Sequence, residues 1–326
     1  MSPENLREST ADPLAEILAL TEAQCFVSRG FEAYGEWALR YPASGRLKFS
    51  AMVEGTCWID FEQGEPRIEL GRGDVVMFDG RQGFLKGNAD VRVEDAVAAF
   101  ESTDGPIACF GSGAADRSGV KVVGVGGHVS VNRTGEELLL RALPPVIVLK
   151  ASDDRAATFR WLLDRLLREA TTTDPGAGLA ADKLAHLLFV ETLRACLAEA
   201  ASLPVGWLRA IADDRIAPAL RLMHDQPGRA WQLEELAQAA AMSRTTFAER
   251  FRSVAGVPPL TYLTNWRMRL AERALREEDV VLSTLARSLG YTSDSAFSNA
   301  FKRVNGLAPR RYRESVTSHR NGRRSS

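Results

Sequence analysis

The sequence predicts an α+β protein of two domains, with a β-barrel and accompanying helices in front and an all-helical domain behind. Its 326 residues fit about two domains. Residues 25–130 carry short apolar or alternating runs between Gly, Pro and Asp clusters, which is typical of a small barrel or sandwich. From residue 207 onward, apolar residues recur at helical spacing. We therefore expect a barrel over 1–150, a helical linking and dimerisation segment over 151–206, a helical domain over 207–315, and a disordered basic tail over 316–326.

The composition is that of an ordinary soluble globular protein, with 45% apolar and 25% charged residues. No run approaches the roughly 18 apolar residues of a membrane helix. The opening residues, MSPENLREST, are polar and lack the apolar region of a secretion signal, so we expect a cytoplasmic protein. The cysteines are scattered and form no C-x-x-C pair, which predicts neither a zinc ribbon nor a disulfide framework: Cys25, Cys57, Cys109 and Cys196.

The net charge of −1 conceals an asymmetry between the two halves of the chain. From Val205 onward there are 20 Lys and Arg against 12 Asp and Glu, a balance of +8, which leaves −9 for the preceding part. A basic back half favours a polyanionic partner.

Several local patterns in the front half predict individual elements. Residues 12–20 predict a helix that Asp12 caps through its side-chain oxygen. In CWIDFE, 57–62, alternate residues share one strand face, so Cys57, Ile59 and Phe61 lie opposite Trp58, Asp60 and Glu62. Another strand is expected within VRVEDAVAAF, 91–100. The glycine-rich GVGGHV, 124–129, opens no clear helix, and we interpret it as a loop rather than a nucleotide cradle.

Two helices are expected between the barrel and the C-terminal domain. In 155–170, an apolar stripe is formed by Phe159, Leu162, Leu163, Leu166 and Leu167. The apolar sector of 178–200 is broader, so this helix is either wholly internal or paired with a second subunit.

The C-terminal part contains two copies of one pattern. They are LEELAQAAAMSRTTFAERFRSVAGVPP, 233–259, and LSTLARSLGYTSDSAFSNAFKRVNGLAP, 282–309. The offset between them grows from 49 to 50 residues at the turn, where the second copy has one extra residue. Each copy predicts a helix, a turn and a second helix, which is helix-turn-helix geometry.

In each copy the second helix has a buried face, a cap and a stop. The buried stripe is Phe247, Phe251 and Val254 in one copy and Phe297, Phe301 and Val304 in the other. Ser243 and Ser293 are expected to cap these helices. Gly256 and Gly306 follow the last apolar position, as a left-handed helix stop requires.

A helix from Pro258 or Pro259 to Glu277 is expected to join the copies. At 1.5 Å per residue it would span ~30 Å, close to the ~34–36 Å of one B-DNA turn. The two second helices could therefore enter successive major grooves on one face of a duplex. Arginines on and beyond this strut are expected to meet phosphates: Arg267, Arg269, Arg273, Arg310, Arg311 and Arg313.

Helical phase predicts which side chains face the DNA. Asn299 could pair with adenine and Glu249 could accept from cytosine, whereas the basic residues suit phosphates. The alternative is that all of these are plain surface residues of a helical bundle. The complete predicted set is Arg244, Thr245, Ala248, Glu249, Arg252, Ser293, Ser295, Ser298, Asn299, Lys302 and Arg303.

These motifs resemble the signature of AraC/XylS-type bacterial transcription regulators. The resemblance covers about 209–315 and implies a seven-helix, two-headed DNA-binding domain. MSRTTFAERF, 242–251, is similar to that family's first reading helix. The residues that carry the resemblance are Ala286, Gly290, Tyr291, Ser293, Ser295, Phe297, Phe301, Lys302, Gly306, Pro309, Tyr312 and Arg313.

The barrel region resembles the cupin-like regulatory domain that many such regulators carry. Metal-binding cupins have histidines where this chain has Phe61, Gln63 and Phe84, and a motif proline where it has Asp79. Catalytic metal sites need about three protein ligands. We therefore expect no metal, no cofactor and no enzymatic activity. The alternative is a cupin-type metalloenzyme fused to a DNA-binding module. A methyl-transfer repair protein would need a clustered cysteine zinc site, which the cysteine spacing disfavours.

Two kinds of signal remain open for this domain. A small apolar or aromatic ligand could lie inside the barrel, or the same residues could simply fill the core: Phe49, Val53, Trp58, Phe61 and Phe78. Some regulators with this type of cupin resemble thiol switches for oxidants, and Cys25 and Cys109 fall in comparable places; alternatively, all four cysteines are small hydrophobic residues.

The sequence thus predicts a DNA-binding transcription regulator whose front domain senses a small molecule or an oxidant. Its expected partners are double-stranded operator DNA and a second copy of the chain. RNA polymerase is a further candidate partner, which would make the protein an activator.

Overall fold

A computed structural model describes residues 12–62, 66–88, 90–92, 107–151, 156–277 and 280–322. Its contacts divide the chain into two units. The helical unit comprises Met1–Thr21, Arg133–Leu138 and Ala200–Ser326, and the β unit comprises Glu22–Asn132 and Leu139–Glu199. Two short segments of the front half, 13–21 and 133–138, therefore pack with the C-terminal helices.

The β unit contains a six-stranded and a four-stranded sheet. The order is β10-β6-β3-β9-β1-β8 in the larger sheet and β2-β7-β4-β5 in the smaller. Only the β1–β8 pair is parallel among the described strands. The strands are β1 Gln24–Tyr34, β2 Ala38–Tyr41, β3 Leu47–Glu54, β4 Cys57–Phe61, β5 Ile68–Leu70, β6 Val75–Phe78, β7 Gly83–Lys86, β8 Ile107–Phe110, β9 Lys121–Ser130 and β10 Val146–Leu149.

The short strands enclose an apolar core, as expected for a barrel or sandwich. The alternation in β4 is confirmed, because Cys57, Ile59 and Phe61 are buried while Trp58 and Asp60 are half-buried. Phe61 and Phe78 meet edge to face in this core, with ring centroids 5.4 Å apart. These two rings are therefore part of the packed core of the β unit. Most of the strand expected within 91–100 lies outside the described residues.

The interpretation of GVGGHV as a loop is wrong, because these residues lie in the central strand β9. Its glycines make room for aromatic rings that cross the strand. A Cβ on Gly124 would lie 2.5 Å from the Phe31 ring, and one on Gly127 would lie 2.6 Å from the Phe49 ring.

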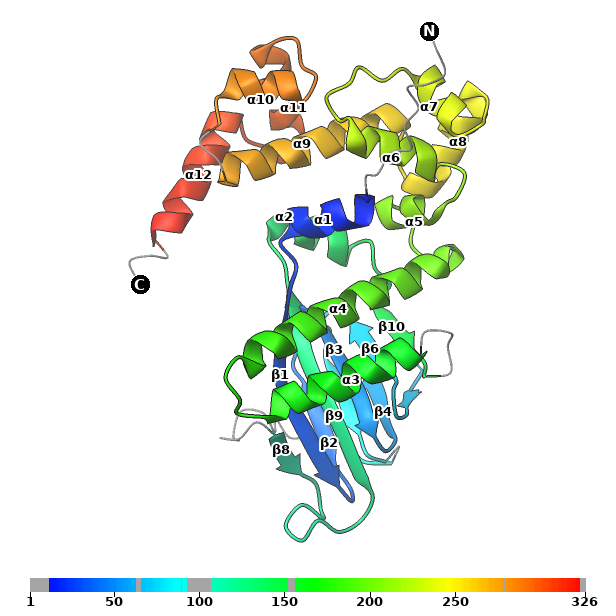
Figure 1. The fold of residues 1–326 in the computed structure, drawn as a ribbon, viewed down its shortest axis with the longest axis vertical. Helices are drawn as coiled ribbons and strands as arrows, with labels where there is room; N and C mark the ends of the chain where they lie inside the picture. Colours follow the sequence, from blue (N-terminus) through cyan, green and yellow to red (C-terminus); the bar gives the residue numbers. More distant parts are fainter. Residues whose placement is uncertain are drawn as a thin grey trace. The chain divides into compact units, whose positions relative to one another are not determined.

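Two helices pack against the six-stranded sheet, α3 Ala156–Thr171 and α4 Ala177–Ala198 (Figure 1). The predicted stripe of α3 is buried, except that Leu167 is half-buried. Helix α4 is not wholly internal, since Leu179 is 66% exposed and Leu187 is 43% exposed. Trp161 on α3 is also exposed.

In the helical unit, the 19-residue helix α9 joins two groups of shorter helices (Figure 1). The helices that the sequence placed in two copies are present, and α6 to α12 supply the seven implied by the family resemblance. Helix α12 continues to Gly322, into the range expected to be disordered, because it extends directly from its start at Pro309; residues 323–326 lie outside the described residues. The helices are α1 Pro13–Thr21, α2 Arg133–Gly135, α5 Trp207–Ala212, α6 Ala217–Asp225, α7 Leu233–Ala239, α8 Arg244–Ala255, α9 Pro259–Glu277, α10 Leu282–Ser288, α11 Asp294–Asn305 and α12 Pro309–Gly322, with single-turn segments Glu136–Leu140 and Ala200–Ser202.

Helix α1 begins as predicted and covers part of α9. The Asp12 carboxylate accepts from the amides of Leu14 and Ala15, at 3.0 and 3.2 Å. Ile17 and Leu20 are buried with Trp266 of α9. None of the described helices combines the length and apolar character that a membrane crossing requires.

Ile17→Ala should lower the free energy of unfolding of the helical unit by about 2 kcal/mol or more, because it opens a cavity against Trp266. Hydrogen exchange of the α9 amides near Trp266 measures this loss. Leu187→Ala on α4 is the matched control and should leave α9 unchanged. Equal α9 protection in Ile17→Ala and in the unmodified protein would contradict the packing of α1 on α9.

Candidate nucleic-acid interface

Equivalent backbone hydrogen bonds close the two helix-turn-helix copies, at 2.9 to 3.1 Å. Both turns also contain a left-handed residue, Ala241 with φ 50° and Gly290 with φ 80°. Ala241 and Gly290 are 49 residues apart, whereas Ser243 and Ser293 are 50 apart. The extra residue of the second copy therefore lies in its turn. The bonds join Met242 to Ala237, Phe247 to Ser243 and Gly256 to Arg252 in one copy, and Tyr291 to Ala286, Phe297 to Ser293 and Gly306 to Lys302 in the other.

The predicted N-caps of α8 and α11 are both confirmed. Ser243 Oγ accepts from the Thr246 amide and Ser293 Oγ accepts from the Ala296 amide, each at 3.2 Å. Both helices then end at left-handed glycines, Gly256 and Gly306. The sequence therefore determines where each second helix starts and stops.

The buried face of each second helix packs on a tyrosine that the sequence analysis did not single out as a repeat. Phe251 meets Tyr262 with ring centroids 5.6 Å apart, and Phe301 meets Tyr312 at 5.5 Å, each with an interplanar angle of 73°. The sequence could have revealed this contact. Tyr262 and Tyr312 are separated by 50 residues, which is the same offset that separates Phe251 from Phe301.

The opposite faces of α8 and α11 carry the residues predicted to face DNA. Ser293 serves as the cap described above, and Ala248 and Ser298 are half-buried. The other predicted residues are exposed, which leaves their contact with DNA a prediction: Arg244, Thr245, Glu249, Arg252, Ser295, Asn299, Lys302 and Arg303.

Arg244 forms an ion pair with Glu234 on α7, at 2.8 Å. The pKa of the Glu234 carboxyl is held below its usual range by the hydrogen bond from Arg244. Both side chains are exposed, and such surface pairs contribute little to stability. Arg244 could therefore exchange this carboxylate for a phosphate at small cost.

Three of the six strut and tail arginines expected to meet phosphates already bind acceptors within the protein. Arg269 pairs with Glu137 and Glu272, at 2.7 and 3.1 Å, and its side chain is only 16% exposed. Arg313 donates to the Val280 carbonyl at 2.5 Å. Arg267 also turns inward. Arg310 and Arg311 are exposed, as a phosphate contact would require.

Arg267 joins the two heads at a close backbone contact. Its guanidinium donates to the carbonyls of Pro227 and Arg229, at 2.5 and 2.8 Å, and lies 5.9 Å from the centre of the Tyr291 ring. Gly228 and Gly290 touch beside it. A Cβ on Gly290 would lie 2.3 Å from the Gly228 carbonyl oxygen. We call this set, Arg267 with Gly228 and Gly290, the inter-head lock.

A second network ties α9 to the front segments and to α12. The Tyr312 hydroxyl donates to Glu272 at 2.9 Å, and burial with this carboxylate raises the pKa of Tyr312. His224 is enclosed between Glu16 of α1, at 2.7 Å, and the Tyr262 hydroxyl, at 2.8 Å. Its ring stacks on Trp266 with centroids 4.1 Å apart. Both ends of the strut are thereby fixed by buried polar contacts.

The structure keeps the two predicted redox cysteines apart. Cys109 is exposed and lies opposite Glu32 of β1, seven residues along the strand from Cys25. At 3.3 Å per residue the separation is roughly 23 Å, whereas a disulfide needs Cα atoms within about 7 Å. Burial and then the Asp182 carboxylate raise the pKa of Cys25 to about 12.

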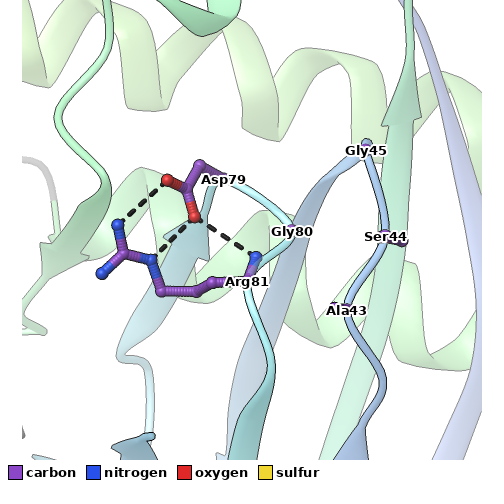
Figure 2. Close-up of a pocket in the computed structure, with 6 residues that line it drawn as sticks. All are labelled: Ala43, Ser44, Gly45, Asp79, Gly80 and Arg81. Atoms are coloured by element: carbon purple, nitrogen blue, oxygen red, sulfur yellow. Dashed lines mark hydrogen bonds and ion pairs between the residues drawn. The ribbon is translucent and has the colours of Figure 1, made fainter. Parts of the chain in front are cut away.

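A hollow of about 460 Å³ in the β unit is lined by residues 43–45 and 79–81 (Figure 2). Arg81 Nε and Nη2 donate to the two Asp79 oxygens at 2.8 and 3.0 Å, which lowers the pKa of Asp79. Within this hollow, Arg81 and Asp79 thus neutralise each other. Among the described side chains, no three His, Cys, Asp or Glu residues gather as a metal site.

Comparison with known proteins identifies the class of protein that this fold defines. A Cupin family model matches residues 12–198, and a Helix-turn-helix domain model matches residues 236–315. An AraC-like transcription regulator of Streptomyces lividans is 36% identical, over 94% of this chain and 99% of that protein. The chain therefore belongs to the AraC-like transcription regulators, with a cupin domain in front of the helix-turn-helix domain.

More distant similarities extend over the same two domains or over the second alone. The RCS-specific HTH-type transcriptional activator RclR of Escherichia coli strain K12 is 25% identical, over 94% of this chain and 98% of that protein. The solved DNA-binding domain of AdpA, the global transcriptional factor, in complex with a target DNA, is 32% identical with a TM-score of 0.32, over 33% of this chain and 98% of that chain.

Gly290→Ala should destabilise the helical unit more than Gly306→Ala. Both glycines are left-handed, with φ of 80° and 78°, so both alanines carry a conformational cost of about 1 kcal/mol. Only the Gly290 Cβ would strike a backbone oxygen, since nothing lies within 4 Å of a Cβ at Gly306. Urea unfolding of the two variants measures the difference, and equal losses would contradict the inter-head lock.

In the folded protein, Cys109 should react with iodoacetamide at pH 8 much faster than Cys25. A pKa of about 12 leaves about one Cys25 in ten thousand as the reactive thiolate. The buried Cys57, whose pKa burial also raises to about 12, is the matched control. Peptide mass spectrometry measures the rates, and Cys25 labelling as fast as Cys109 would contradict this environment.

Proposed function

We propose that the protein is a sequence-specific, two-headed transcription regulator in which α8 and α11 enter successive major grooves on one face of the operator. The observation that carries the proposal is the pair of equivalently capped helices held on one 19-residue helix and joined again by the inter-head lock. Helix α9 would span ~28 Å at 1.5 Å per residue, close to one helical repeat of the duplex.

Different residues of the two exposed faces suit different parts of the DNA. Asn299 and Glu249 have the side chains that pair with adenine and cytosine in the major groove. Arg252, Lys302 and Arg303 are exposed cations without a hydrogen-bond acceptor among the described contacts, as phosphate binding requires. The affinity should therefore combine base preference with a steep salt dependence.

The cupin domain is proposed to receive the signal, and α1 with residues 133–138 to transmit it. These segments directly precede β1 and follow β9, and they contact α9 through Ile17 and Glu137. A change at the ends of those strands would therefore act on the strut. Exposed Leu179, Leu187 and Trp161 suit a homodimer contact, and RNA polymerase would be the partner of an activator.

An oxidant is the second candidate signal. It is favoured by the exposed thiol of Cys109 and by similarity to a relative named RCS-specific. Because Cys25 and Cys109 are far apart in this fold, such sensing would act through each thiol separately or between two copies of the chain. Stoichiometric iron or zinc in the purified protein would instead favour the cupin-type metalloenzyme alternative.

Asn299→Ala should relax sequence preference at one operator position by about 1–3 kcal/mol, whereas Lys302→Ala should weaken all sequences equally and reduce the salt slope by about 1. Anisotropy titrations on a set of single-base operator variants separate the two effects. Footprinting should show two protected segments one helical turn apart. Uniform weakening by Asn299→Ala would exclude it as a base reader, and a single protected segment would contradict the two-headed mode.

A further inference from the structure

A cavity of about 300 Å³ lies within the β unit, separate from the hollow of Figure 2 although Ser44 borders both. Its walls come from β1, β2, β3 and β9 and from the segment before β3. The residues that matter are Ser28, Tyr41, Arg46, Lys48, Gly126 and His128. We call it the basic pocket. This volume suits a small organic molecule.

Strand register explains why these side chains meet. Phe26 of β1 pairs with His128 of β9, and His128 pairs with Lys48 of β3. Directly paired residues share one face of a sheet, so the three form a row across it. The Phe26 and His128 rings stack with centroids 5.4 Å apart. Two residues earlier, Gly126 adds no side chain to this row; a Cβ there would lie 3.2 Å from the Phe49 carbonyl oxygen and 3.6 Å from the Tyr41 hydroxyl.

The basic pocket carries cations that the protein does not neutralise. Lys48 Nζ donates to the Pro42 carbonyl and lies 5.8 Å from the centre of the Tyr41 ring. Arg46 donates to His128 Nε2 at 3.1 Å, so this nitrogen is unprotonated and accepts. Neither cation pairs with a carboxylate among the described residues. Asp182, which acts on His128, accepts a hydrogen bond from the Val27 amide.

Partial burial strengthens the positive electrostatic potential that Lys48 and Arg46 create in the basic pocket. Lys48 is half-buried, and burial lowers its pKa. The pKa of His128 is lowered by burial and then by the neighbouring charges of Arg46 and Lys48. Charges removed from water without a partner are costly, and an anion that pairs with them would remove that cost. In the hollow of Figure 2, by contrast, Asp79 already neutralises Arg81.

We propose that the basic pocket binds a small organic carboxylate as the regulatory ligand of the cupin domain. Arg46 and Lys48 hold the carboxylate, and the Tyr41 ring with the bare backbone at Gly126 accepts its apolar body. The inference rests on the proposed sensing role and names its ligand class.

The position of the pocket also suggests how its occupancy reaches the strut. Phe26 is close to the start of β1, which follows α1, and His128 is close to the end of β9, which leads to residues 133–138. Those two segments contact α9 through Ile17, which packs against Trp266, and through Glu137. A ligand that moves the Phe26–His128 pair thus acts on both connections to the helical unit.

Calorimetric titration of the full-length protein tests the proposal, with benzoate and hexanoate as probes and benzyl alcohol and hexanol as uncharged counterparts. We expect at least one carboxylate to bind and both alcohols to fail. Arg46→Gln, at an exposed position, and Lys48→Met should each weaken that binding about tenfold or more. Lys183→Met, which removes an exposed lysine of α4, is the matched control and should bind as the unmodified protein does.

The proposal is overturned if neither carboxylate binds at 10 mM, if the alcohols bind equally well, or if Lys183→Met weakens binding as much as Arg46→Gln. Operator affinity of the same variants, measured without any carboxylate, separates this failure from that of the proposed function. If the protein binds its operator but no carboxylate, only the proposal that the basic pocket binds a carboxylate is refuted. Absent operator binding by the unmodified protein refutes the regulator mode as well.

Discussion

The inward-turned guanidinium of Arg267 is the contact on which the two-headed arrangement depends. A single α-helix can bend or twist, so a strut alone would leave the heads free to vary. Arg267 instead bridges the loop before α7 and the turn before α11, where Gly228 and Gly290 allow their backbones to touch. The spacing of α8 and α11 is thus fixed by a closed structure rather than by one rod. A rigid pair of heads loses less entropy on binding than two independent ones.

The helical unit is completed by residues that precede β1 and by residues that lie between β9 and β10 of the cupin domain. Ile17 and Leu20 cover Trp266, and Glu137 neutralises Arg269 on the same helix. The surface that supports the helical unit is therefore built partly from segments that adjoin strands of the cupin domain. If the cupin domain binds a ligand as proposed, these segments would connect it along the chain to α9, without requiring any particular placement of the two units.

Local patterns made much of this fold predictable from sequence. The phenylalanine stripes, serine caps and glycine stops recur at a fixed offset, and all depend on neighbours within one helix. The strand β9 was missed because its glycines, read locally, indicate a turn, whereas they actually admit rings from other strands. Arg267 and Arg269 were read as phosphate contacts because their acceptors, such as Arg229 and Glu137, lie 38 and 132 residues away.

The most direct test of the fixed head spacing is a change in the DNA rather than in the protein. Once an operator is mapped, five base pairs inserted between its two contacted segments turn one segment to the opposite face of the duplex. If the inter-head lock holds, affinity should fall to that of an operator with one segment deleted. Unchanged affinity for the inserted operator, measured at the same salt concentration, would show that the heads move independently and would contradict the account.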